Sequence, residues 1–104
     1  MNTLLEANMI EIEEFIDYNC VIYVVKGTKK YHREDGPAIE WDNGDKEWYI
    51  NGKLHRDDGP AQVYCDTFFW YLNGIRLPTR EGWFEALPED GRLKLLYSEN
   101  FIRG

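Results

Sequence analysis

The chain of 104 residues has no long apolar segment, few cysteines and no basic residue among its first 20. A helix that crosses a membrane needs about 20 mostly apolar residues in a row, and no segment approaches that length. The amino-terminal stretch MNTLLEANMIEIEEF lacks the basic start of a secretory signal and carries acids where such a signal has none. We therefore expect a protein that contacts no membrane and stays in the cytoplasm.

The two cysteines, Cys20 and Cys65, are far apart in the sequence and form no C-x-x-C motif. They are too few for a zinc site, and this usage predicts free, reduced thiols. The sequence contains no glycine-rich phosphate loop and no Ser-His-Asp or Cys-His arrangement. We therefore expect no cofactor, no metal site, no catalytic residue and no enzymatic activity.

The net charge of −7 is unevenly distributed along the chain. Residues 1–20 hold five acids and no base, residues 21–80 hold nine of each, and residues 81–104 hold five acids and three bases. Nucleic acid needs a basic surface, so direct binding to it is disfavoured. An acidic segment can instead attract a basic protein surface, including one that normally holds nucleic acid. The acids of this segment are Glu6, Glu11, Glu13, Glu14 and Asp17.

The acidic segment has the pattern of an amphipathic helix. Thr3 and Glu6 match the S/T-x-x-E capping box, which places a helix start at Thr3. In helical projection the apolar side chains gather in one arc and the acids fill the opposite side. We expect a helix over residues 4–18. A continuation into a strand is the alternative, because Ile10, Glu11 and Ile12 alternate.

Two segments of the chain nearly repeat each other. Residues 31–41 (YHREDGPAIEW) and residues 54–64 (LHRDDGPAQVY) share the string H-R-x-D-G-P-A, 23 positions apart. The string W-Y-x-N-G at residues 48–52 recurs at residues 70–74, 22 positions apart. A period of this length predicts one supersecondary unit, here two short strands and two turns.

Turn residues separate the expected strands. Asn-Gly pairs favour type I′ hairpins, which need a positive φ at both central positions. Asp-Gly-Pro cannot continue a strand ladder, because proline lacks the amide donor and glycine relaxes the backbone. The expected turn residues are Asp35, Gly36, Pro37, Asn51, Gly52, Asp58, Gly59, Pro60, Asn73 and Gly74.

Between these turns we expect an antiparallel meander of six or seven short strands over residues 20–77. Expected strands include residues 21–25, 38–41, 46–50 and 53–55. Alternation places Trp48, Ile50, Trp70 and Leu72 on one face of the sheet. The other face carries Tyr49, Phe69 and Tyr71. It is a candidate binding surface or dimer interface, unless the helices wrap around and cover it.

The carboxyl-terminal segment returns to a helical pattern. Thr79 is expected to cap a short helix through about Leu87, and Pro88 to open a second helix in the N1 position. Leu93, Leu96 and Tyr97 are expected to face inward. The predicted fold class is therefore α+β, as a single domain over residues 1–104, with an acidic helix (1–19), a repeat-built sheet (20–77) and carboxyl-terminal helices (78–104).

The string HREDGPAIEWDNGDKEWYINGKLHRDDGPA, followed by WYLNG, resembles a family of uncharacterised repeat proteins from bacteriophages, other large viruses and bacteria. The tandem unit of that family reads W-Y-x-N-G-K-x-H-R-E-D-G-P-A and is distantly similar to MORN-type β-hairpin repeats. The resemblance covers about residues 21–76 and departs at Ile75 and at residues 67–69. It implies a repeat-built sheet and no particular reaction. The matching positions include His32, Arg33, Asp35, Gly36, Pro37, Trp48, Asn51 and Gly52.

The two H-R-x-D-G strings also allow a chemical interpretation. Each places a histidine beside two carboxylates, as a general acid–base pair or a divalent metal site would. Turn geometry already accounts for both strings, and a scaffold gains from repetition whereas an active site is needed only once. We interpret them as structural turns, with a metal-dependent enzyme as the alternative. The two sets are His32, Glu34 and Asp35, and His55, Asp57 and Asp58.

The expected function is that of a small acidic protein-interaction module encoded by a phage or mobile element. Its acidic segment and its face with Tyr49, Phe69 and Tyr71 would bind a host protein. The resemblance makes an inhibitor of a bacterial defence system, such as a CRISPR effector with a basic surface, the concrete form of this hypothesis. The alternative is a MORN-like structural module that forms a homodimer through its open edge or aromatic face.

Overall fold

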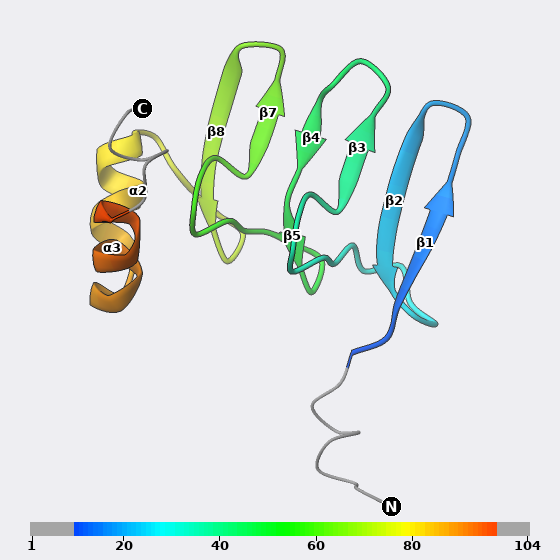
Figure 1. Ribbon diagram of the computed structural model, residues 1–104, viewed down its shortest axis with the longest axis horizontal. Coiled ribbons are helices and arrows are strands. Elements are labelled where there is room, and N and C mark those ends of the chain that lie inside the picture. The colour runs from blue at the N-terminus through cyan, green and yellow to red at the C-terminus, as the bar shows by residue number, and fades with distance from the viewer. Residues whose placement is uncertain (1–9, 98–104) are drawn as a thin grey trace, which may run out of the picture.

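The computed structural model describes residues 10–97 as an α+β fold dominated by one antiparallel sheet (Figure 1). Seven strands pair in the order β1-β2-β3-β4-β7-β8-β9, and β5 and β6 form a separate two-stranded sheet. The strands are β1 (Ile12–Ile16), β2 (Cys20–Val25), β3 (Ile39–Trp41), β4 (Lys46–Glu47), β5 (Tyr49–Ile50), β6 (Lys53–Leu54), β7 (Gln62–Tyr64), β8 (Thr67–Leu72) and β9 (Ile75–Leu77). The helices are α2 (Arg80–Ala86) and α3 (Glu89–Leu96).

Within residues 10–97, neither helix has the length and apolar character that crossing a membrane requires.

The strand register defines the two faces of the large sheet. Residues directly opposite each other on neighbouring strands point to the same side. One such row crosses five strands through Ile22, Ile39, Glu47, Gln62 and Phe69. We call the side to which this row points the Glu47 face.

The prediction of an amino-terminal helix over residues 4–18 is wrong in its second half, where the chain forms the strand β1. β1 pairs antiparallel with β2, from Ile12 opposite Val25 to Ile16 opposite Val21. Without β1, one edge of β2 would leave its backbone N–H and C=O groups unpaired. Pairing these groups outweighs the helical preference of the segment. The first half of the expected helix, with its capping box, lies outside the described residues.

The strand expected over residues 46–50 is interrupted at Trp48. The Trp48 N–H donates to the Ala61 carbonyl at 2.8 Å, and the Trp48 carbonyl accepts from the His55 N–H at 3.1 Å. The chain therefore leaves the large sheet after β4 and pairs with β6 as β5. Strand β6 ends at Leu54, one residue before the expected end.

Both Asn-Gly pairs have the left-handed backbone that a type I′ turn requires. The φ angles are 49° and 79° at Asn51 and Gly52, and 50° and 82° at Asn73 and Gly74. The first pair connects β5 to β6, and the second connects β8 to β9.

The two carboxyl-terminal helices are confirmed, with two differences in detail. The Thr79 hydroxyl accepts the Gly82 N–H at 2.9 Å and caps α2 as expected. Pro88 stands at the N-cap of α3, one position before the expected one. The expected inward stripe of α3 faces solvent, with its members Leu93, Leu96 and Tyr97 all exposed. The helix docks through Leu95, which lies on the other side of α3 and is buried.

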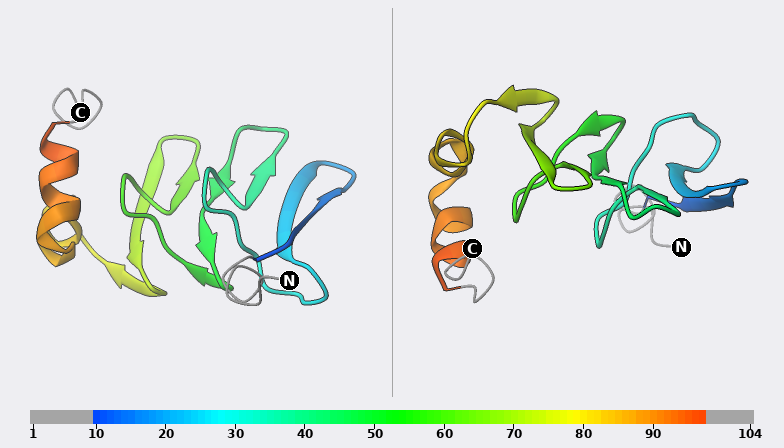
Figure 2. Two further views of the ribbon diagram at one scale, coloured as in Figure 1. Left: turned by 60° about the horizontal axis from the view of Figure 1, so that its bottom comes forward. Right: turned by 90° about the horizontal axis from the view of Figure 1, so that it is seen from above.

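The main hydrophobic cluster joins the helices to one end of the sheet. Its buried members are Trp83, Leu87 and Leu95, packed against Trp70, Leu72, Leu77 and Phe84. The helices stand beside β8 and β9, at the end of the sheet away from β1 (Figure 2). Trp70 and Leu72, on the side of β8 opposite the Glu47 face, therefore receive the helices.

Candidate functional site

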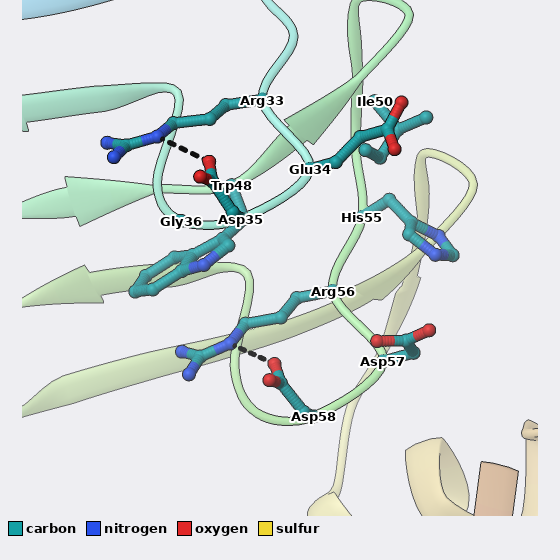
Figure 3. A pocket seen from close by; sticks show the side chains of 10 residues that line it. All are labelled: Arg33, Glu34, Asp35, Gly36, Trp48, Ile50, His55, Arg56, Asp57 and Asp58. Atoms are coloured by element: carbon teal, nitrogen blue, oxygen red, sulfur yellow. Dashed lines mark hydrogen bonds and ion pairs between the residues drawn. The ribbon is translucent and has the colours of Figure 1, made fainter.

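The two H-R-x-D-G turns border a groove with a volume of about 560 Å³ (Figure 3). Most of its lining comes from residues 33–36 and 55–58, and Trp48 and Ile50 supply the rest. The groove therefore contains most of the residues for which the sequence offered a chemical alternative.

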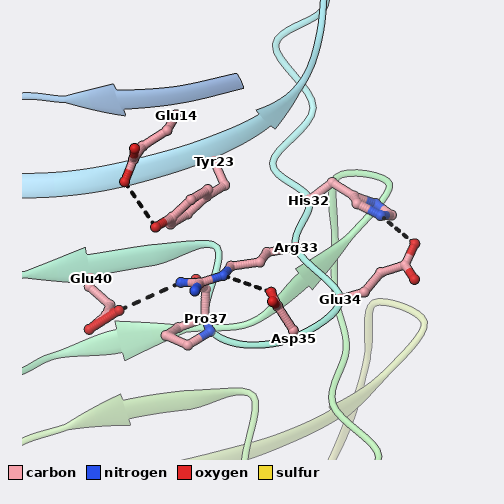
Figure 4. A network of polar contacts seen from close by, with 8 residues as sticks. All are labelled: Glu14, Tyr23, His32, Arg33, Glu34, Asp35, Pro37 and Glu40. Carbon is pink, nitrogen blue, oxygen red and sulfur yellow. Dashed lines mark hydrogen bonds and ion pairs between the residues drawn. The ribbon is translucent and has the colours of Figure 1, made fainter. Parts of the chain in front are cut away.

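Arg33 closes the first turn (Figure 4). Its Nε donates to Asp35 Oδ1 at 3.0 Å, and its Nη1 donates to the Pro37 carbonyl at 3.2 Å. The guanidinium lies 4.2 Å from the centroid of the Tyr23 ring, and Nη1 is 3.7 Å from a Glu40 carboxylate oxygen. This side chain is thus engaged by its own turn and by the neighbouring strands.

Arg56 makes the corresponding contacts in the second turn. Its Nε donates to Asp58 Oδ1 at 2.7 Å, and its Nη1 donates to the Pro60 carbonyl at 3.1 Å. The guanidinium lies 3.8 Å from the centroid of the Trp48 ring. Exposed ion pairs contribute little by themselves, so the carbonyl bond and the ring contact give this arginine its structural role.

The glycines of these two turns are explained by close packing, and not by the relaxed backbone expected from the sequence. Neither Gly36 nor Gly59 is among the residues with positive φ. A Cβ at Gly36 would lie 3.1 Å from Arg33 Cζ, and one at Gly59 would lie 2.7 Å from Arg56 Cζ. Glycine leaves room for the arginine side chain that crosses over the backbone, and at Gly59 a Cβ would force that side chain to shift.

The two histidines hold the Asn-Gly turns. His32 Nδ1 accepts the Asn51 N–H at 2.9 Å, and His55 Nδ1 accepts the Asn73 N–H at 2.9 Å. A ring nitrogen that accepts an amide hydrogen carries no proton, so the ring proton of each histidine is on Nε2. His32 Nε2 lies 3.2 Å from Glu34 Oε2, and the His32 side chain is 2% exposed. The Nδ1 atoms are therefore already occupied by backbone bonds.

Within residues 10–97, no three His, Cys, Asp or Glu side chains come together in a group that could hold a metal ion. Cys20 is buried, Cys65 is exposed, and no disulfide joins them.

The predicted aromatic residues Tyr49, Phe69 and Tyr71 all lie on the Glu47 face. Tyr71 follows Phe69 by two positions in β8, and the Tyr49 hydroxyl reaches Glu47. All three are half-buried. The Arg76 guanidinium lies 5.0 Å from the centroid of the Phe69 ring, so the protein's own cation partly covers this ring.

Glu47 is a candidate site residue that the sequence reasoning missed. Its side chain is buried, and it accepts hydrogen bonds from Tyr49 Oη at 2.9 Å, from Gln62 Nε2 at 2.9 Å and from Tyr64 Oη. All three donors are neutral, and among the described residues no ion pair involves Glu47. The sequence did contain a signal for this site. Glu47 takes the position that Phe69 takes before the second W-Y-x-N-G string, so an acid stands on a face that otherwise carries aromatic residues.

Tyr49 is expected to stay protonated at a pH at which an ordinary tyrosine ionises. Burial and then the hydrogen bond to Glu47 raise the pKa of Tyr49 above its usual value of about 10. Since the folded pKa exceeds the unfolded one, the associated stability is complete below about pH 10 and is lost as the pH rises further. The measurement is an alkaline titration of phenolate absorbance on wild type and on Tyr49→Phe. At about pH 11 both proteins should show the same absorbance increase. A smaller increase in the variant, by one tyrosine equivalent, would contradict the assignment.

The acids around β1 are mostly exposed and have few partners. Glu11 Oε2 lies 3.3 Å from Lys26 Nζ, and Glu14 Oε2 accepts a hydrogen bond from Tyr23 Oη at 3.0 Å. The hydrogen bond to Glu14 raises the pKa of Tyr23. Glu13 is half-buried and Asp17 is exposed. The remaining predicted acid, Glu6, lies outside the described residues.

Apolar side chains are exposed along the same segment. Ile16 is 79% exposed and Phe15 is 51% exposed, with Ile10, Ile12 and Tyr18 also exposed. β1 thus combines exposed apolar groups with negative charge.

Comparison with protein-family models, with curated proteins and with solved structures found no match for this chain.

Proposed function

We propose that the protein is a non-enzymatic interaction module that binds and inhibits a basic host protein through β1. The observation that carries this proposal is β1, an acidic strand with exposed apolar side chains whose outer edge no other strand among residues 10–97 covers. The resemblance of residues 21–76 to phage repeat proteins supports a bacterial defence effector as the partner. The protein would act in the cytoplasm of the host cell.

Among residues 10–97, the outer edge of β1 has backbone groups that pair with no other strand. The Asp17 N–H donates to the Cys20 carbonyl, and the Glu11 carbonyl accepts the Lys26 N–H, both toward β2. In an antiparallel ladder every second residue bonds to the same neighbour. The N–H and C=O groups of Ile12, Glu14 and Ile16 therefore point away from β2, where no other strand among residues 10–97 pairs with them. An extended segment of a partner can add to such an edge.

Charge determines which segment fits this edge. Residues 10–19 contain four acids and no base. A basic segment with alternating apolar residues would satisfy both the charge and the exposed isoleucines. A second copy of β1 would instead place acids against acids, which disfavours the homodimer alternative.

The first test changes the charge of this strand. The double variant Glu13→Lys with Asp17→Lys leaves the two hydrogen-bonded acids in place. The control, Asp66→Lys with Glu85→Lys, makes the same charge change at exposed positions away from β1. The assay is plaque formation by a targeted phage on bacteria that carry a CRISPR effector. We expect the wild type and the control to restore plaques, and the β1 variant to lose about tenfold or more of this effect. Equal behaviour of the two double variants would argue against β1 as the binding surface.

The second test blocks the edge without changing its charge. Ile16→Pro removes an N–H that points away from β2, so pairing within the sheet is kept. We expect this variant to fold and to lose inhibition of the effector. If inhibition is absent in the wild type and sedimentation finds a dimer that Ile16→Pro dissociates, the structural-module alternative is favoured instead.

A further inference from the structure

A second hollow lies on the Glu47 face, with a volume of about 500 Å³. Four aromatic side chains and two carboxylates contribute to its lining. They are Tyr31, Trp41, Tyr49 and Tyr64, and Asp45 and Glu47. Among residues 10–97 no basic side chain lines it, so within this part of the chain nothing in the lining balances its negative charge.

Glu47 is the centre of this imbalance. Its side chain is 7% exposed, and its three hydrogen-bond donors are two phenols and an amide. None of these three donors carries a positive charge. A buried charge is costly unless a charge of opposite sign compensates it. A cation placed in the hollow would supply that compensation.

Asp45 is the second carboxylate, and it is held in place. Asp45 Oδ1 accepts the Cys65 N–H at 3.1 Å, and Asp45 Oδ2 accepts from Asn43 Nδ2 at 3.2 Å. Both donors are again neutral. The two carboxylates are therefore oriented before any ligand arrives, which lowers the cost of binding one.

The aromatic side chains suit the same ligand. The rings of Tyr31 and Tyr49 lie 5.0 Å apart at an angle of 59° and form one wall. Faces of tyrosine and tryptophan attract organic cations. Elsewhere the protein places its own guanidinium groups over aromatic rings, at Tyr23, Trp48 and Phe69. Trp41 receives no such cation from the described residues.

We propose that this hollow binds an organic cation, namely the guanidinium or ammonium group of an arginine or lysine side chain presented by another protein. Aromatic faces supply the attraction to the cation, and Glu47 and Asp45 supply the opposite charge. This site is separate from the outer edge of β1, and the inference stands whether or not that edge binds a partner.

The test is a titration with N-acetyl-arginine amide, followed by nuclear magnetic resonance of the backbone amides and the Trp41 indole. The neutral analogue N-acetyl-citrulline amide has nearly the same shape and serves as the ligand control. We expect saturable shifts around Trp41 and Glu47 with the arginine probe, and affinity lower by about tenfold or more with citrulline.

Two variants locate the binding. Glu47→Gln removes the charge, and Trp41→Leu removes an aromatic wall without changing any charge. Each should reduce affinity for the arginine probe by about tenfold or more. The matched control is Glu40→Gln, which removes a carboxylate from the opposite face of the sheet. The inference is overturned if citrulline binds as tightly as arginine, or if the folded variants bind like wild type. It is also overturned if the shifts spread over all acidic positions.

Discussion

Replacing Trp83 with alanine is expected to lower the free energy of unfolding by about 3–5 kcal/mol. The Trp83 side chain is 0% exposed and sits at the centre of the cluster that joins α2 to the sheet. Its ring packs against Trp70 with centroids 4.7 Å apart, and its Nε1 donates to the Arg56 carbonyl at 2.9 Å. Alanine would leave a cavity and an unpaired carbonyl. The loss is a large fraction of the total stability of a small domain, which is about 5–15 kcal/mol.

Chemical denaturation followed by circular dichroism measures this loss. Trp83→Phe keeps much of the packing but not the Nε1 donor, so its loss should be smaller than that of alanine. Tyr97→Ala, at a side chain that is 85% exposed, is the control and should change stability by less than about 0.5 kcal/mol. If Trp83→Ala lost less than about 1 kcal/mol, the cluster would not be what holds the helices to the sheet.

Replacing His32 with alanine is expected to cost about 2–4 kcal/mol. His32 is 2% exposed, and its Nδ1 is the acceptor for the N–H of Asn51 in the first Asn-Gly turn. Alanine would remove the buried ring and leave that N–H without its partner. The same denaturation experiment measures the loss.

Two further variants separate packing from hydrogen bonding. His32→Asn places a carbonyl oxygen near the position of Nδ1 and should recover part of the stability that alanine loses. His55→Ala removes the corresponding bond to Asn73, but His55 is only half-buried, so it should cost less than His32→Ala. Equal losses of stability at the two histidines would show that the burial of His32 contributes little to the free energy of unfolding. Neither result would support a catalytic role for these histidines.

The Trp70 ring is covered differently from the Trp48 ring. Arg56 lies over Trp48, while the corresponding ring of Trp70 is packed against Trp83. Helix α2 thus covers the Trp70 ring through Trp83, whereas the Trp48 ring is covered by Arg56. The sequence predicted α2 from the Thr79 cap and the apolar spacing, but it did not indicate where Trp83 would dock.

Features that depend on neighbouring residues were predictable from the sequence. The Asn-Gly turns, the Thr79 cap and the alternation of β8 each follow from the local chemistry of a few residues. The sequence by itself thus determined the Asn-Gly turns, the two carboxyl-terminal helices and the concentration of acids near the amino terminus.

Only the tertiary structure decided the features that depend on distant partners. β1 is a strand because Ile12–Ile16 lie against β2. The strand breaks at Trp48 because its N–H still bonds to Ala61 while its carbonyl accepts from His55. Glu47 is buried because Gln62 and Tyr64, far along the chain, bring their donors to it. Pairing and burial of this kind can outweigh the local preference for a helix. Differences in helix propensity are less than about 1 kcal/mol per residue, whereas a buried polar group left without a hydrogen bond costs more free energy than that. Both proposed binding surfaces, the outer edge of β1 and the hollow around Glu47, belong to this second class.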